Sequence, residues 1–279
     1  MTPWNEADPP VLPPAPPGRR LLAVLRLAAI ALGTPLLLAA FLIAQALNRA
    51  GLPRWQDGVQ SLWARMCLSL CGLSLRVEGT RMPHGGALVA NHVSWIDIFT
   101  ILAAGRVTFL AKAEVRGWPG IGPLAAVTGT MFIERRAAAA RRQQEEMRAR
   151  IARGELLCFF PEGTSTDGMR VLPFKSTLFA AFMSEELRAA VWVQPVTLVY
   201  DPPAGLPAAI YGWWGEMPFG RHVWDVTTRS RGGQATVIYH PPLRAADFAD
   251  RKALAAACGR LVAEGMAAHR ARHPLPEAV

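Results

Sequence analysis

The feature that most constrains this chain is an uncharged run from residue 27 to residue 47. As an α-helix, at about 1.5 Å per residue, this run would be roughly 31 Å long, close to the hydrocarbon thickness of a bilayer. Hydrophobic residues make up 51% of the 279 positions and charged residues 18%, which is enough apolar material for a core and for contact with lipid. The run therefore predicts a membrane segment, which we place at residues 20–48 as one helix or a re-entrant hairpin.

The topology of this segment stays open. Residues 33–35 are Gly-Thr-Pro, which permits a kink or a hairpin. Basic residues normally decide orientation, but here they lie on both sides of the run: Arg19, Arg20 and Arg26 before it, Arg49 and Arg54 after it. Residues 44–46, Ala-Gln-Ala, resemble the cleavage site of a secretory signal, although the run exceeds the usual length of about 7–15 residues.

The flanking segments have different compositions. Residues 1–19 are rich in proline, which cannot donate a backbone hydrogen bond, so we expect a disordered leader. Residues 49–72 place apolar side chains at helical spacing, namely Val59, Leu62, Trp63, Met66 and Leu70. This pattern predicts an amphipathic helix in the headgroup layer; the alternative is a helix that faces the core of a domain.

Residues 73–279 alternate between strand and helix patterns. Short apolar or β-branched runs predict strands at residues 73–77, 87–90, 107–111, 131–133, 156–160 and 191–200. Helical patterns cover residues 96–104, 137–152, 175–183 and 246–269. The alternation predicts an α/β domain with a central mixed sheet flanked by helices.

A first polar block, Asn-His-Val-Ser-Trp-Ile-Asp at residues 91–97, directly follows the strand at 87–90. Sites in open α/β sheets gather beyond the carboxyl ends of strands. His92 can act as a general base if Asp97 holds its other ring nitrogen. Ser94 and Asp97 also match a capping box, so the carboxylate has a purely structural alternative role.

Two further blocks follow strands. Residues 129–136, Gly-Thr-Met-Phe-Ile-Glu-Arg-Arg, place Arg135 where its planar fork can hold a phosphate. Residues 159–165, Phe-Phe-Pro-Glu-Gly-Thr-Ser, offer close backbone approach at a glycine and hydroxyl donors. Taken singly, residues 129–136 also fit a solvated surface, and residues 159–165 also fit an ordinary turn. Lys175 then stands at the entry of the next helix.

Together, in this order, the blocks NHVSWID, GTMFIERR, FPEGTS, LPFKS and VQPV resemble those of the 1-acylglycerol-3-phosphate acyltransferase family, the glycerolipid acyltransferases with an NHxxxxD motif. The resemblance covers roughly residues 73–200. It implies that His92 is the general base and Asp97 its orienting partner. It also implies a substrate-binding region made of residues on the later blocks: Arg135, Glu162, Gly163, Thr164 and Lys175.

Other segments look closer to a bacterial branch of this family that acylates lyso-ornithine lipid. These segments are residues 171–179, residues 211–217 (Tyr-Gly-Trp-Trp-Gly-Glu-Met) and residues 240–242. Many family members also have a glycine two residues after the lysine of the fourth block, where this chain has Thr177.

The resemblance implies a membrane-bound O-acyltransferase that moves a fatty acyl group from acyl carrier protein or coenzyme A to a lysolipid hydroxyl. The expected acceptor is 1-acyl-sn-glycerol-3-phosphate, which gives phosphatidic acid; the alternative is lyso-ornithine lipid. No cofactor and no metal are implied. Because thioester donors are cytoplasmic in bacteria, we expect the catalytic domain on the cytosolic side of the inner membrane.

Two other classes of protein compete with this interpretation. A lipid hydrolase would be expected to carry a Gly-x-Ser-x-Gly elbow, and the sequence has none. A membrane-tethered interaction protein is the non-enzyme alternative, because the net charge of +9 favours anionic partners. The basic helix at residues 137–152 lacks aromatic residues, so we expect no nucleic-acid binding.

Overall fold

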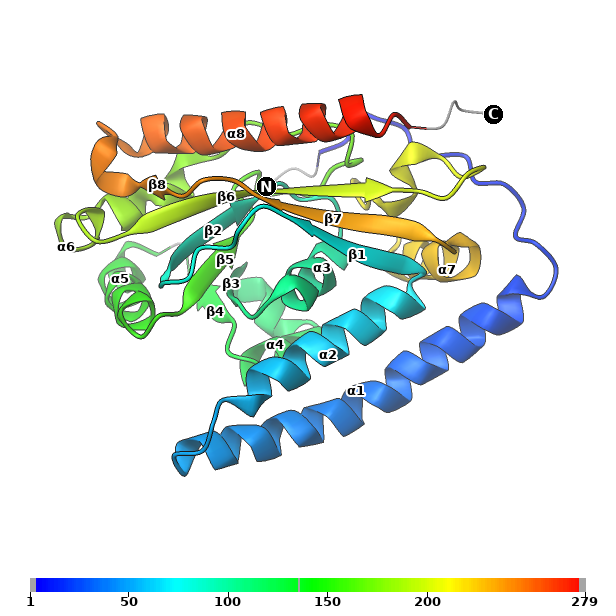
Figure 1. Cartoon of the computed structure of the whole chain (residues 1–279), viewed down its shortest axis with the longest axis horizontal. Helices are drawn as coiled ribbons and strands as arrows, with labels where there is room; N and C mark the ends of the chain where they lie inside the picture. The colour runs from blue at the N-terminus through cyan, green and yellow to red at the C-terminus, as the bar shows by residue number, and fades with distance from the viewer. Residues whose placement is uncertain (1–3, 135, 276–279) are drawn as a thin grey trace.

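The computed structural model describes residues 4–134 and 136–275 and contains a mixed sheet with helices on both faces (Figure 1). The strands are β1 (Leu73–Glu78), β2 (Gly86–Ala90), β3 (Thr108–Lys112), β4 (Met131–Ile133), β5 (Leu156–Phe159), β6 (Trp192–Asp201), β7 (Gly233–Tyr239) and β8 (Leu243–Arg244). They lie in the order β1-β7-β6-β2-β5-β3-β4, with β8 beside β6. Paired strands are parallel, except that β7 and β8 run antiparallel to β6. The predicted mixed α/β sheet is confirmed.

Helices cover the two faces of this sheet unequally. The α-helices are α1 (Arg19–Arg49), α2 (Trp55–Leu70), α3 (Ile96–Ala104), α4 (Ile121–Val127), α5 (Ala137–Ala152), α6 (Glu185–Arg188), α7 (Phe219–Arg229) and α8 (Arg251–Arg272). Short 3₁₀ helices are η1 (Ala113–Gly117), η2 (Ser176–Met183), η3 (Ala208–Tyr211) and η4 (Ala245–Asp247). Figure 1 shows α8 along one face of the sheet, and α2 and α3 on the other side with α1 outermost.

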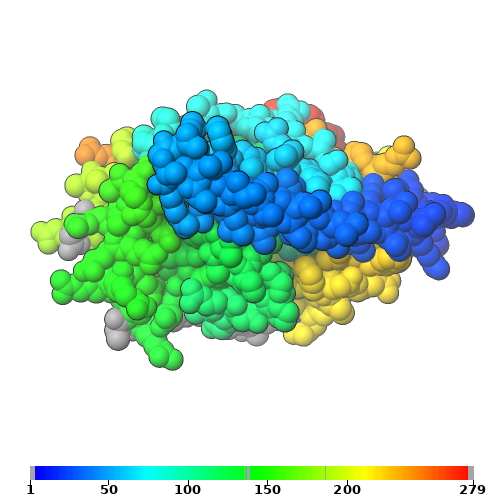
Figure 2. All heavy atoms as spheres, turned by 90° about the horizontal axis from the view of Figure 1, so that it is seen from below, coloured from blue at the N-terminus to red at the C-terminus, as the bar shows by residue number. Residues whose placement is uncertain are grey.

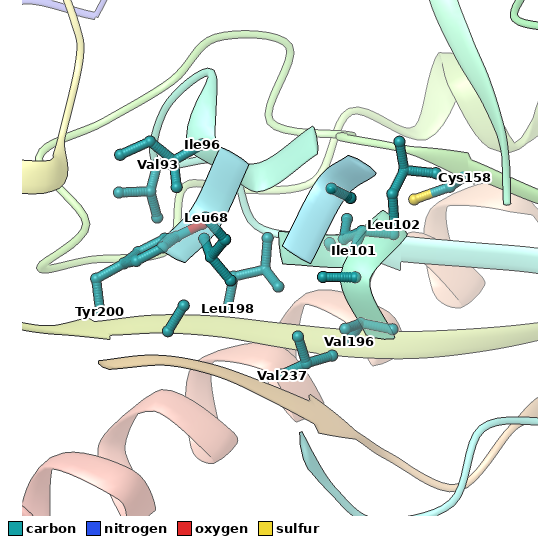
Figure 3. Packing of buried hydrophobic residues seen from close by; sticks show 14 of the residues in the cluster. Leu68, Val93, Ile96, Ile101, Leu102, Cys158, Val196, Leu198, Tyr200 and Val237 are labelled. Carbon is teal, nitrogen blue, oxygen red and sulfur yellow. The ribbon is translucent and has the colours of Figure 1, made fainter. Parts of the chain in front are cut away.

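The core follows from the alternation of side chains along β2. Every residue of β2 is buried. Leu88 and Ala90 pack into the cluster beneath α2 and α3, whereas Ala87 and Val89 pack into the cluster beneath α8 and η2. A strand covered on both faces reads as a continuous apolar run. Figure 3 shows the first cluster, in which the Tyr200 ring extends from β6 toward Val93 and Ile96.

Helix α1 contains the predicted membrane segment and is one continuous helix through Gly33, Thr34 and Pro35. Residues 20–48 do not fold back on themselves as a hairpin; α1 pairs with the following helix, α2, to form a helical hairpin. The Trp63 indole donates a hydrogen bond to Thr34 Oγ1 at 3.0 Å, and a Cβ on Gly33 would meet the Met66 side chain at 3.0 Å. Figure 2 shows α1 lying along the face of the molecule.

For residues 49–72 we considered a headgroup-layer helix and a core-facing helix, and in the structure one side of α2 packs against the core. Ala64, Cys67 and Leu68 are buried, and Trp63 packs edge-on against Phe99 with ring centroids 5.2 Å apart. The physical reason is that α2 lies between α1 and α3. Helix α1 presents most of the outward apolar side chains, including Leu21, Leu25, Leu32, Leu36 and Ile43, and Trp55 and Leu62 of α2 are exposed as well.

The N-terminal segment, which we expected to be disordered, lies against the domain from Trp4 onward. The Trp4 side chain is 7% exposed and packs on Trp214, with ring centroids 5.9 Å apart. The Trp214 indole donates to the Ala7 carbonyl at 2.9 Å, and Arg229 donates to the Pro13 carbonyl at 2.9 Å. Proline prevents helix formation here, but it does not prevent the extended backbone from packing.

Candidate active site

The residues of the first polar block lie at the carboxyl end of β2, where the chain turns into α3. The His92 Nδ1 atom lies 2.6 Å from Asp97 Oδ2. The Asp97 side chain is fully buried, whereas the His92 side chain is 24% exposed. The imidazole stacks on the Phe160 ring with centroids 4.2 Å apart. The predicted pairing of His92 with Asp97 is therefore present in the structure, with the histidine as the outer member.

Asp97 also accepts hydrogen bonds from groups that take no part in proton transfer. The backbone N–H groups of Val93 and Ser94 donate to Asp97 Oδ2 at 2.7 and 3.0 Å. The Tyr200 hydroxyl donates to Asp97 Oδ1 at 2.7 Å. Both roles considered for Asp97 are thus combined in one carboxylate, because the bonds that cap the turn also fix the oxygen that faces His92.

This arrangement determines which nitrogen of His92 is free to act. A carboxylate accepts hydrogen bonds, so Nδ1 carries the proton and Nε2 presents a lone pair. The carboxylate would stabilise the imidazolium that forms when Nε2 takes a proton. A histidine held in this way can deprotonate a hydroxyl that approaches from the exposed side of the ring.

Glu162 was expected in the substrate-binding region, and in the structure its carboxylate contacts the neighbouring backbone. The side chain is 1% exposed and accepts hydrogen bonds from the backbone N–H groups of His92 at 3.0 Å and Leu172 at 3.3 Å. Burial raises the pKa of this carboxyl to about 8, although the two backbone bonds oppose the shift. Because both oxygens face the backbone, we assign Glu162 to positioning the His92 loop.

The neighbouring turn contains two further predicted residues. Gly163 has φ +73°, in the left-handed region that favours glycine. The Thr164 hydroxyl donates to the Ser165 carbonyl at 3.3 Å and accepts from the Trp4 backbone N–H at 3.4 Å. The backbone N–H of Lys175 donates to the Pro161 carbonyl at 2.9 Å, so this residue adjoins the same turn. The structure therefore brings Gly163, Thr164 and Lys175 together around one turn.

The expectation for Arg135 lies outside the described residues. A metal role was not implied by the sequence, and among residues 4–134 and 136–275 no cluster of three His, Cys, Asp or Glu side chains suited to a metal ion occurs.

Cys158 is fully buried in β5, where burial raises the pKa of its thiol. A buried thiol with a raised pKa is a poor nucleophile, so it contributes only to packing.

Several residues that shape the site were not predicted. Tyr200, at the carboxyl end of β6, supports Asp97 from the neighbouring strand. Asn91 exchanges two hydrogen bonds with the backbone of Leu198, at 2.9 and 2.7 Å, and so ties the motif to β6. A tyrosine at a strand end is a weak signal, because its target lies 103 residues away in the chain.

His222 supports the motif from α7. The Trp95 indole donates to His222 Nδ1 at 2.9 Å, and His222 Nε2 lies 3.1 Å from the Ile210 carbonyl. Burial lowers the pKa of this imidazole to about 4. His222 is therefore neutral near pH 7 and holds Trp95 through a fixed tautomer.

Comparison with known proteins is consistent with this geometry. Residues 74–199 match the family model described as Acyltransferase. A lyso-ornithine lipid O-acyltransferase from Rhodobacter capsulatus is 47% identical over 266 residues, covering 94% of this chain and 96% of that protein. A 1-acyl-sn-glycerol-3-phosphate acyltransferase from Neisseria gonorrhoeae is 38% identical over 112 residues, covering 39% of this chain and 43% of that protein.

Among solved structures, the fold is similar to the crystal structure of the 1-acyl-sn-glycerophosphate (LPA) acyltransferase PlsC from Thermotoga maritima. The TM-score is 0.60 at 24% sequence identity, and the match covers 91% of this chain and 97% of that chain. At this identity the likeness concerns the fold alone.

Proposed function

This chain is a lysolipid acyltransferase of the acyltransferase family, and we propose that its acceptor is a lyso-ornithine lipid. The observation that carries the proposal is the extent of the similarity. The Rhodobacter capsulatus relative matches 94% of this chain, and so includes most of the residues on both sides of the 74–199 family region. Similarity to the Neisseria gonorrhoeae enzyme covers only 39%.

Residues 211–217 lie outside the 74–199 family region and beside the candidate base. The similarity beyond the family region therefore bears on the choice of acceptor. The Trp213 backbone N–H donates to the Val93 carbonyl at 3.0 Å, and the Ser165 hydroxyl donates to the Trp213 carbonyl. Trp213 and Trp95 both pack against Phe219, with ring centroids 5.6 and 5.9 Å apart. Trp213 and Phe219, both outside the family region, therefore form an aromatic wall beside the His92 loop.

In the proposed reaction, His92 Nε2 takes the proton of the acceptor hydroxyl as its oxygen attacks the thioester carbonyl carbon. Asp97 stabilises the imidazolium. The tetrahedral intermediate then expels the carrier thiolate, and His92 returns the proton to that sulfur. The donor is acyl carrier protein or coenzyme A, and the products are the O-acylated lipid and the free thiol.

A second acceptor, 1-acyl-sn-glycerol-3-phosphate, was the first choice from the sequence, and one observation still favours it. The Neisseria gonorrhoeae relative is named for that substrate. If this chain shared that activity, the product would be phosphatidic acid. Arg135 would then be expected to hold the acceptor phosphate through charge-assisted hydrogen bonds.

The two acceptors can be compared in one assay. Membranes that contain the protein receive labelled acyl donor together with equal amounts of lyso-ornithine lipid and lysophosphatidic acid, and the product lipids are identified. Membranes with His92→Ala serve as the control for other acyltransferases. We expect His92-dependent ornithine lipid as the main product. If phosphatidic acid is the main product, the proposed acceptor is wrong.

We also propose how the protein lies on the membrane. Helix α1 is the one helix among the described residues that is long and apolar enough to cross a bilayer. However, its inner face is occupied, since Arg26 donates to the Thr227 and Ser230 carbonyls at 2.7 and 2.9 Å and Thr34 accepts from Trp63. A crossing helix would draw α2 and its Asp57–Arg106 ion pair into hydrocarbon, which is costly.

We therefore place α1 in the plane of one leaflet, with its exposed leucines toward the acyl chains. The catalytic domain then lies on the cytosolic side of the inner membrane. Cysteines introduced at residue 20 and at residue 54, near the two ends of α1, provide the test. Both should react with an impermeant thiol reagent from the cytosolic side. Labelling of the two ends from opposite sides of the membrane would mean that α1 crosses the bilayer.

A further inference from the structure

A concave site lies at the edge of the domain, between the N-terminal half of α1 and the sheet. Its volume is about 510 Å³, within the roughly 300–1,000 Å³ of small-molecule sites. The walls come from α1, α2, β1 and the turn that leads into β7, elements that meet at one end of the molecule in Figure 1. Among the described residues its lining includes neither His92 nor Asp97, so it is separate from the candidate active site.

The lining carries three guanidinium groups, those of Arg26, Arg65 and Arg231, and no carboxylate among the described residues. The hydroxyl-bearing residues Ser69 and Ser74 also line it. Guanidinium groups bind phosphate oxygens through paired N–H donors. The chemistry of the cavity therefore selects an anion, and a phosphate suits it best.

Two of these arginines are held in place before any ligand arrives. Arg26 Nη1 donates to the Thr227 and Ser230 carbonyls at the end of α7. Arg65 Nε donates to the Ala103 carbonyl at the end of α3, at 3.1 Å. In each case the bonds use one nitrogen of the guanidinium, so the other nitrogens stay available to an anion. Such preorganisation lowers the entropy lost on binding.

The position of the cavity indicates where the phosphate comes from. Arg26 belongs to α1, and the preceding Leu21, Val24 and Leu25 are 64%, 51% and 58% exposed. With α1 in the leaflet, a headgroup in the cavity would have its acyl chains beside these three apolar side chains. We infer that the cavity binds the phosphate headgroup of an anionic membrane phospholipid, which fixes the orientation of the domain on the leaflet.

This inference rests on the proposed placement of α1 and is independent of the acceptor. Full-length protein is mixed with vesicles of phosphatidylcholine alone, or of phosphatidylcholine with phosphatidylglycerol, and the bound fraction is measured. Salt near 0.15 M limits diffuse attraction, because it screens charges beyond about 8 Å. We expect wild-type protein to bind both vesicles and to prefer those with phosphatidylglycerol by about tenfold, as one charge-assisted hydrogen bond supplies.

Two variants change the cavity in different ways. Arg231→Gln removes a cation from its wall, and Ser69→Phe fills it without changing the charge. Both should lose the preference for phosphatidylglycerol while still binding phosphatidylcholine vesicles and retaining acyltransferase activity there. Arg20→Gln, in the exposed first turn of α1, and Arg260→Gln, on α8, remove the same charge elsewhere and should keep the preference.

The outcomes separate the two proposals. Failure to bind either kind of vesicle contradicts the placement of α1. Equal binding to both vesicles, a preference retained in Ser69→Phe, or an equal loss in Arg20→Gln overturns the lipid site. Dissolved sn-glycerol 3-phosphate provides the last comparison. It is added at the same molar concentration as the phosphatidylglycerol in the vesicles. If it abolishes the preference for phosphatidylglycerol vesicles, the cavity binds a soluble phosphate and the inference is wrong.

Discussion

The described residues include two histidine–aspartate pairs, which lie on opposite faces of the same sheet. On one face His92 Nδ1 lies 2.6 Å from Asp97, and on the other His269 Nε2 lies 2.9 Å from Asp201. In the first pair the carboxylate is fully buried and the imidazole 24% exposed. In the second pair this is reversed, because His269 is fully buried and Asp201 is 25% exposed.

The partners of each carboxylate reinforce the difference. Asp97 accepts from two backbone N–H groups and the Tyr200 hydroxyl, none of which carries a positive charge. Asp201 forms an ion pair with Arg270, and the second ring nitrogen of His269 is buried without a hydrogen-bond partner. The exposed imidazole and the carboxylate without a competing cation make His92–Asp97 the better suited of the two pairs to general-base chemistry.

The largest expected difference between the pairs is in rate. His92→Ala should lower turnover by about 10²–10⁴-fold, the usual contribution of a general base, with little change in melting temperature. His269→Ala should leave turnover nearly unchanged but lower stability, because it opens a cavity in the packing of α8. Initial rates on one vesicle preparation and thermal melts of both variants provide the measurement. Near-normal turnover of well-folded His92→Ala would end the assignment.

Substitution of the two carboxylates sharpens the same comparison. Asp97→Asn should reduce turnover by orders of magnitude and also lower stability by about 1–3 kcal/mol, because the new amide group faces donors. Asp201→Asn should affect stability alone. Ser94→Ala is the matched control for the turn, since its hydroxyl accepts only from the Ile96 N–H, at 3.2 Å. It should cost about 1 kcal/mol and preserve turnover. If Ser94→Ala lost as much turnover as Asp97→Asn, the turn rather than the charge would be responsible.

Removal of the Tyr200 hydroxyl should have a smaller effect. Tyr200→Phe deletes one hydrogen bond to Asp97, so we expect kcat to fall about tenfold, equivalent to 1.4 kcal/mol, without a change in KM. Thr100→Val is the control, because it removes the 3.0 Å contact with the same hydroxyl but spares the bond to Asp97. Steady-state kinetics of both variants test the role, and equal losses of kcat would contradict it.

The last expected effect concerns Glu162 and pH, and it is an effect on stability and not on turnover. Its pKa is raised to about 8 in the folded protein, so the folded state binds a proton more tightly than the unfolded state. Its contribution to stability is present below the unfolded pKa, near 4.3, and is lost as the pH rises through about 8. Between these values this group should lower the free energy of unfolding by at most about 1.4 kcal/mol per pH unit. Glu162→Gln should flatten that dependence in urea unfolding measured from pH 5 to pH 8, and an unchanged slope would refute it.

The structure has strands at each of the six predicted positions, but the prediction missed the short elements α4, α6 and β8 and the longer elements β7 and α7. The inner face of α7 is mostly polar, with His222, Asp225, Thr227 and Thr228 buried, so a search for apolar spacing does not find it. Strand β7 begins with Gly233, a residue depleted in strands, but its Thr-Val-Ile-Tyr end is favourable for a strand, so this element was readable from the sequence and was overlooked. Helix α7 forms because of what it packs against, and it contacts α1 from a distant part of the chain.

The sequence by itself determined the acyltransferase blocks, the α/β alternation and the apolar character of α1, because each depends on residues close together in the chain. It also placed His92 five residues from Asp97, within reach of one turn. Only the tertiary structure decided that α2 faces the core, that Glu162 faces the backbone, and that Tyr200 supports Asp97 whereas the next residue, Asp201, pairs with His269. The physical reason is that successive residues of a strand point to opposite faces of the sheet. Which helix covers each face is decided by packing between distant segments, and that packing determines which member of each His–Asp pair remains exposed.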